Sequence, residues 1–97
     1  MDDLYQMFDF VTNEDGEIML LIFAAEVEPE NPMFEVDKAE NTLWVYRTSE
    51  NAVGLCDIEP QIIEKLSKLK TLLVCEMNLP PANEKSEIVY VYEAKLL

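Results

Sequence analysis

Apolar residues follow two different spacings along this chain, and the change between them predicts its elements. Up to about residue 56, short apolar runs alternate with turn residues, which is typical of β-strands. From residue 58 to 69, apolar positions lie three or four residues apart, as on one face of a helix. The last part of the chain returns to strand-like runs.

The run from Ile18 to Ala25 is free of charge and predicts a central strand. Glu17 and Glu26 bound it, and it is far shorter than the roughly 20 apolar residues that a membrane span needs. Odd and even positions are both apolar, so both faces of this strand should be buried. Other parts of the protein must therefore cover each face.

The first twelve residues fit two patterns. A helical turn followed by a strand that ends at Thr12 is the first interpretation, and a helix throughout is the second. The sequence Asn13-Glu14-Asp15-Gly16 favours the first, because Asp-Gly between apolar runs is a strong hairpin signal. We therefore expect the residues up to Thr12 to pair with the central strand.

Five further strands are predicted at residues 33–37, 42–47, 53–56, 71–77 and 86–94. Pro29 and Pro32 mark a loop before the first of them, because proline removes a backbone donor. Side chains alternate along a strand, so Trp44 and Tyr46 should share one face of strand 42–47. In the last strand, the same alternation places Ile88 with the tyrosines at 90 and 92.

Residues 58–69 predict one long amphipathic helix. Pro60 suits its first turn, and the lysines near its end suit the helix dipole. The apolar face consists of Ile58, Ile62, Ile63, Leu66 and Leu69. We expect a single α+β domain over residues 1–97, with this helix on one face of a mostly antiparallel sheet of five or six strands. A short N-terminal helix is the open alternative.

A single helix leaves the other face of this sheet without a cover. The N-terminal segment, a sheet that curls on itself, or a second molecule would supply one. A homodimer therefore stays open, since large exposed apolar patches usually mark interaction sites.

The charges are unevenly distributed. The chain has 20 acidic and 7 basic residues, a net charge of −13, and residues 1–37 hold eleven carboxylates and no base. Phosphates would be repelled, so we expect neither direct nucleic-acid binding nor binding to an anionic membrane. A field of one sign steers a basic partner, although acids also keep small proteins soluble and protect sheet edges.

The residue types exclude several chemistries. The chain has no histidine, so a Ser–His or Cys–His pair is absent, and two separated cysteines do not make a zinc site. The glycines are Gly16 and Gly54, too few for a phosphate-binding loop, and a calcium-loop register around Gly16 lacks its terminal carboxylates. We expect no enzyme, cofactor or metal. Cys56 and Cys75 indicate free thiols in a reducing cytoplasm, with a disulfide between them as the lesser alternative.

These observations predict a small, non-enzymatic protein-binding module. It would inhibit or sequester a basic, nucleic-acid-handling protein, as immunity proteins, antitoxins and phage-encoded anti-CRISPR inhibitors do, with carboxylates in place of phosphates. The alternatives are an acidic, dimeric secretion-type chaperone that binds an effector segment, or an assembly subunit. The expected contact residues are the acids around the hairpin and after the central strand, with two aromatic anchors: Asp9, Glu14, Asp15, Glu17, Glu26, Glu28, Glu30, Trp44 and Tyr46. Whether the acidic part or the aromatic sheet face makes the contact stays open.

Overall fold

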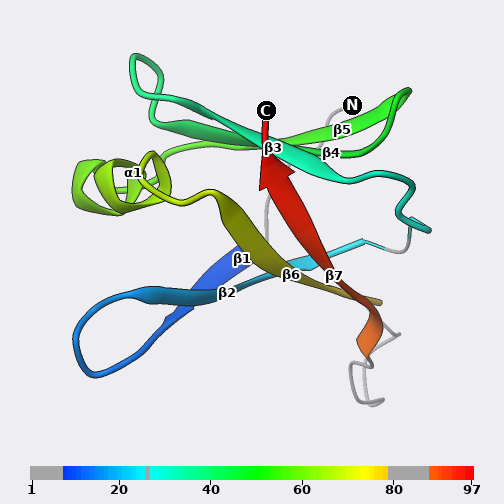
Figure 1. Ribbon diagram of the computed structural model, residues 1–97, viewed down its shortest axis with the longest axis horizontal. Coiled ribbons are helices and arrows are strands. Elements are labelled where there is room, and N and C mark those ends of the chain that lie inside the picture. The colour runs from blue at the N-terminus through cyan, green and yellow to red at the C-terminus, as the bar shows by residue number, and fades with distance from the viewer. Residues whose placement is uncertain (1–7, 26, 79–87) are drawn as a thin grey trace.

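The computed structural model describes residues 8–25, 27–78 and 88–97, and they form a curled half-barrel of strands (Figure 1). Within these residues, seven strands make one sheet in the order β1-β2-β6-β7-β3-β4-β5. The elements are β1 (Phe8–Thr12), β2 (Ile18–Ala24), β3 (Met33–Asp37), β4 (Thr42–Thr48), β5 (Asn51–Leu55), α1 (Pro60–Leu66), β6 (Thr71–Met77) and β7 (Ile88–Leu96).

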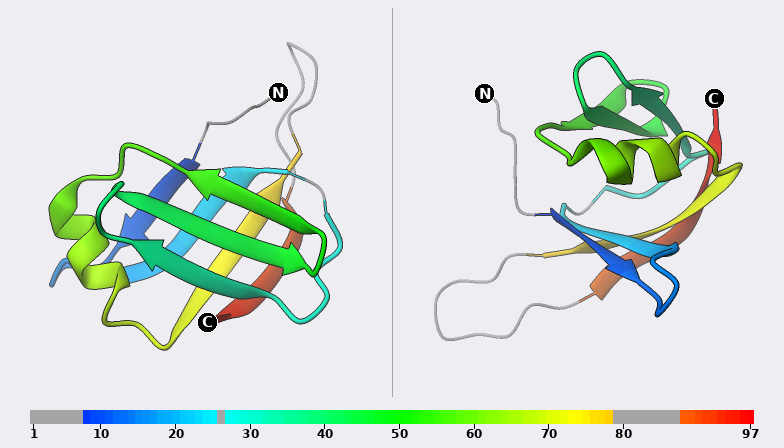
Figure 2. Two further views of the ribbon diagram at one scale, coloured as in Figure 1. Left: turned by 90° about the horizontal axis from the view of Figure 1, so that it is seen from above. Right: turned by 90° about the vertical axis from the view of Figure 1, so that its left-hand side faces the viewer.

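The sheet folds into two layers. One layer is β1-β2-β6-β7 and the other is β3-β4-β5, and they meet where β7 pairs with β3 through Met33↔Lys95 and Phe34↔Leu96. Figure 2 shows the layers facing each other, with α1 between them at one end. The buried core fills this space and includes Leu21, Phe23, Phe34, Leu43, Val45, Leu55, Ile63, Leu66, Leu72 and Val74. A curled sheet is therefore what covers the inner face of β2.

The prediction of an α+β fold with a helix over 58–69 is wrong, because α1 has seven residues and the described chain is mostly strand. Ile58 is buried ahead of the helix, where its N–H donates to the carbonyl of Asn41 at 3.1 Å. After α1, the N–H of Leu69 donates to the carbonyl of Leu66 at 3.1 Å, three residues back, so this turn is tighter than an α-helix. The apolar spacing therefore continues beyond both ends of the helix.

The strand count also differs from the prediction. Every segment predicted as a strand is one, so seven strands are present in the described residues instead of five or six. Four pairings are antiparallel, whereas β2–β6 and β3–β7 are parallel, so the sheet is mixed. None of the described helices is long and apolar enough to cross a membrane.

The hairpin of β1 and β2 is confirmed, and residues 8–12 are strand, so a helix throughout this region is wrong. Asn13 holds the turn, since its Oδ1 accepts the N–H groups of Asp15 at 3.0 Å and Glu17 at 2.9 Å. Gly16 has a φ of +78°, a value that favours glycine. The alternative of a short N-terminal helix falls on residues 1–7, outside the described residues.

Candidate functional site

The outer face of the β1-β2-β6-β7 layer is apolar. The inward side chains of β2 and β6, such as Phe23 and Val74, belong to the core, so their neighbours along each strand point outward. The register places Ile22 beside Cys75, and Cys75 beside Val91. We call the outward set the outer apolar face; it consists of Val11, Leu20, Ile22, Leu73, Cys75, Met77 and Val91.

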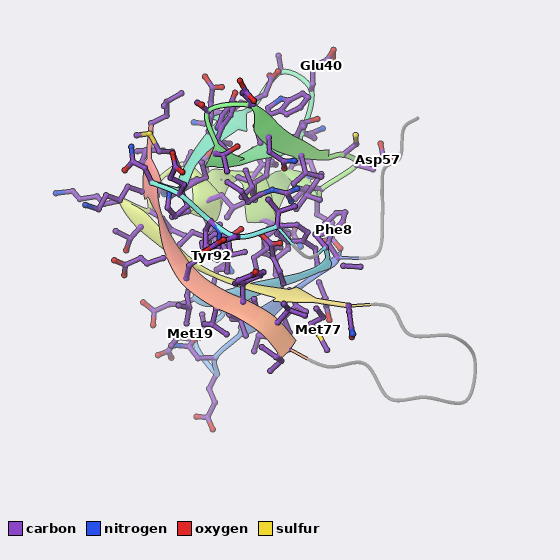
Figure 3. The ribbon with its side chains drawn as sticks, turned by 90° about the vertical axis from the view of Figure 1, so that its right-hand side faces the viewer. Phe8, Met19, Glu40, Asp57, Met77 and Tyr92 are labelled. Carbon is purple, nitrogen blue, oxygen red and sulfur yellow. The ribbon has the colours of Figure 1, made fainter. Side chains whose placement is uncertain are left out.

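Most of this face is open to solvent in the described part of the chain, although Cys75 is buried among its neighbours. Val11, Leu73 and Val91 are 41%, 43% and 57% exposed. The helix α1 and the β3-β4-β5 layer both lie on the inner side (Figure 2). Figure 3 shows Met19 and Met77 on the outer side of the layer, with Tyr92 between the layers. Four adjacent strands thus present apolar side chains without a cover among the described residues.

Acidic side chains border the outer apolar face. Asp9 lies on β1 opposite Ile22, and Glu93 lies on β7 opposite Leu73. The exposed hairpin carboxylates Glu14, Asp15 and Glu17 extend from the end of the same layer. We call these five residues the acidic border. A hydrogen bond from α1 holds the hairpin in place, because Lys65 Nζ donates to the Gly16 carbonyl at 2.6 Å.

The structure brings together some of the residues predicted as contacts. Asp9, Glu14, Asp15 and Glu17 lie on one hairpin and form four of the five residues of the acidic border. Glu28 and Glu30 are exposed in the segment that leads from β2 to β3, and Glu26 lies outside the described residues. The two aromatic residues are on β4, in the other layer. The predicted set therefore divides between two surfaces.

The sequence predicted an uncovered sheet face but not which strands and residues form the outer apolar face. The available signal was β6, where Leu72 and Val74 alternate with Leu73 and Cys75, so both faces of the strand are apolar. The same pattern in β2 predicts two buried faces, but Leu20 and Ile22 on its outer face are only half-buried. The register shift between Glu76 and Met77 also cannot be read from the sequence. It pairs Met77 with Ile88, so the prediction that Ile88 shares a face with the tyrosines is wrong.

Trp44 and Tyr46 share the outer face of β4, as predicted, while Leu43 and Val45 are buried on the other side. Trp44 lies across Gly54 of β5, with which it pairs in the register. The Tyr46 hydroxyl donates to Glu35 Oε1 at 2.9 Å, and this bond to a carboxylate raises the pKa of Tyr46 above its ordinary value. Two aromatic side chains are thus fixed on a second exposed surface.

Gly54→Ala should displace the Trp44 ring. A Cβ at position 54 would lie 2.9 Å from Cη2 and Cζ3 of Trp44, closer than real contacts allow. We expect a red shift of the fluorescence of this single tryptophan and a loss of about 1 kcal/mol in the free energy of unfolding. Ala52→Ser, on the same face of β5, is the control. An unchanged emission spectrum for Gly54→Ala would contradict the contact.

A buried polar cluster lies between the layers, at the end away from α1. Glu76 is fully buried; its Oε1 accepts the Val27 N–H at 2.9 Å and its Oε2 accepts the Tyr92 hydroxyl. Arg47 is 6% exposed, donates through Nε to Asn51 Oδ1 at 2.8 Å and lies 5.5 Å from the centre of the Phe23 ring. Its Nη1 has no hydrogen-bond partner among the described residues. The cluster connects β6, β7 and the segment after β2.

Among the described residues, no group of three or more cysteines, aspartates and glutamates lies close enough together to hold a metal ion. Cys56 is exposed and Cys75 is buried, and both thiols are free, so the disulfide alternative is wrong. Burial, and next the nearby Glu76 carboxylate, raise the pKa of Cys75. This shift makes the Cys75 thiol a poor nucleophile.

Stability should fall at alkaline pH because of Tyr92. Burial, and next the bond to Glu76, raise the pKa of Tyr92 far above its ordinary value near 10. The unfolded chain then loses the Tyr92 proton above about pH 10 while the folded chain retains it, which costs about 1.4 kcal/mol per pH unit. Urea unfolding between pH 9 and 11 measures this slope. Tyr92→Phe should reduce it, and Tyr46→Phe, at an exposed site, should reduce it less; equal slopes in all three proteins would contradict the assignment.

The fold and these surfaces define a small, acidic, mostly β protein with an apolar sheet face that the described residues leave uncovered. Comparison of the chain with models of protein families, with curated proteins and with solved structures found no match. Function is therefore inferred from the surfaces of the molecule.

Proposed function

We propose that this protein is a non-enzymatic binding module that inhibits or sequesters a basic, nucleic-acid-handling protein. The observation that supports this function best is the outer apolar face with its acidic border. Contiguous exposed apolar surface rimmed by polar residues marks interaction sites in soluble proteins. A border of carboxylates adds selection for a partner of positive charge.

The two parts of this surface contribute in different ways. Apolar side chains such as Leu73 and Val91 would supply affinity through burial against the partner. The carboxylates would accelerate encounter with a basic surface and occupy positions where that partner binds phosphates. The hairpin is held by Asn13 and Lys65, so little conformational entropy is lost when it docks.

A basic partner fits this surface better than a second copy of the chain. In a face-to-face dimer, two acidic borders would approach each other, and each copy carries a net charge of −13. Like charges across an interface oppose association. Charge repulsion between two copies therefore favours the inhibitor over the dimeric chaperone. The free thiols of Cys56 and Cys75 support a reducing, cytoplasmic setting for the complex.

Charge reversal in the hairpin tests the proposal. With a panel of purified basic nucleases as probes, inhibition of DNA cleavage should weaken as salt increases. The triple variant Glu14→Lys, Asp15→Lys, Glu17→Lys should lose about 10- to 100-fold in inhibition constant.

The matched control changes the net charge equally at exposed turns elsewhere: Glu40→Lys, Glu50→Lys and Glu59→Lys. It should lose only a few-fold, through the weaker overall field. Equal losses in both triple variants would reject the hairpin as the contact. Failure to inhibit any nuclease in the panel would reject the proposed class of partner.

A further inference from the structure

The Trp44 ring forms a flat platform on the outer face of the β3-β4-β5 layer. Gly54 has no side chain, so the ring contacts the neighbouring strand directly, with the atoms Cη2, Cζ3 and Cε3 nearest to it. One ring face is thereby covered by β5. Trp44 is still 38% exposed, so the indole presents apolar surface to solvent.

A carboxylate lies on the strand next to this platform. Glu35 of β3 lies directly opposite Trp44 in the antiparallel ladder, where paired Cβ atoms are about 5 Å apart, while the ring extends over Gly54 on the other side of β4. The Tyr46 hydroxyl holds Glu35 Oε1 at 2.9 Å, which limits the rotation of the carboxylate. A carboxylate offers about four lone-pair positions, so Glu35 retains capacity for a further donor.

The basic side chains of the described chain leave this carboxylate available. Lys95 is the nearest base by register, in the row of Met33 and Tyr46, and no ion pair joins it to Glu35 among the described residues. Lys38, in the turn that follows β3, pairs with Glu64 at 3.5 Å. The platform thus combines an aromatic side chain with a negative charge that no base among the described residues pairs with.

A planar cation is the ligand that both groups accept. A guanidinium stacks on an aromatic face and donates two parallel hydrogen bonds to a carboxylate, whereas an ammonium does not match that geometry. The core of this protein contains the first of these contacts, where Arg47 lies over Phe23. We propose that Trp44 and Glu35 bind an arginine side chain of the partner protein.

This inference deepens the proposed function, because it names the side chain that a basic partner would present at a second surface. The acidic border and the platform lie in different layers of the half-barrel. A partner that contacts both must therefore reach around the molecule, or the two surfaces must act on different partner segments. The test below uses no partner protein, so its result is independent of the nuclease experiment.

Titration of the full chain with N-acetyl-arginine amide tests the site, with fluorescence of the single tryptophan as readout. We expect a saturable change in the millimolar range, a weaker response to the lysine analogue and none to the citrulline analogue, a neutral isostere. Glu35→Gln should weaken arginine binding about 3-fold. Glu50→Gln, an equal change of charge at an exposed turn, should leave it unaltered.

Two outcomes would overturn the inference. An equal response to arginine and citrulline would show that the guanidinium charge is not recognised. Equal affinities of Glu35→Gln and the parent protein for N-acetyl-arginine amide, with saturable binding in both, would show that the Glu35 carboxylate takes no part in binding.

Discussion

Glu76→Leu should lower the free energy of unfolding by about 3 kcal/mol. The leucine would fill a similar volume but leave the Val27 N–H and the Tyr92 hydroxyl, both partly buried, without their acceptor. Each unsatisfied buried donor costs about 1–3 kcal/mol. Urea unfolding at neutral pH measures the loss, and a change below 1 kcal/mol would contradict the role of the carboxylate.

Two further variants separate the contributions to this cost. Glu76→Gln retains one acceptor oxygen and should lose about half as much, because its amide nitrogen cannot accept the second bond. Adding Tyr92→Phe to Glu76→Leu should recover part of the loss, since the orphaned hydroxyl is then removed. The double-mutant cycle would therefore show a coupling free energy of about 1 kcal/mol or more between Glu76 and Tyr92.

Val91→Glu should weaken binding of an inhibited basic nuclease by about 100-fold. The substitution adds a negative charge to the outer apolar face. Electrostatic attraction alone would then strengthen binding to a basic partner. A loss of affinity would therefore show that Val91 makes an apolar contact, the kind that dominates interface energies. The inhibition constant measures it.

The fold should tolerate this change, because Val91 is 57% exposed. Ala52→Glu, on the outer face of β5 in the other layer, adds the same charge and serves as the control. Equal or tighter inhibition by Val91→Glu than by the parent protein would exclude the outer apolar face from the contact.

The strand positions followed from the sequence because local signals bound them. Residues 33–37 and 71–77 were predicted with the bounds that the structure gives, and the Asp15-Gly16 turn led to the correct hairpin. Alternation shows which residues share a face of a strand but not which strands are neighbours. The parallel pairing of β2 with β6 joins segments about fifty residues apart, and no local pattern specifies it.

The candidate surfaces were predictable to different degrees. The acids of the hairpin are consecutive in the sequence, so their proximity followed from the turn. The pairing of Trp44 with Glu35 depends on the β3–β4 register, which the turn between them sets and the sequence pattern alone leaves undetermined. The helix was predicted too long because Ile58 and Leu69 continue the apolar spacing in non-helical backbone.

The junction between the layers has a consequence for synthesis of the chain. β3, β4 and β5 are consecutive and pair with each other, so they can associate soon after they leave the ribosome. β7 is the last described strand to be translated, and among the described strands its pairing with β3 is what connects the two layers into one sheet. Until it emerges from the exit tunnel, the nascent half-barrel stays open and exposes its interior to chaperones.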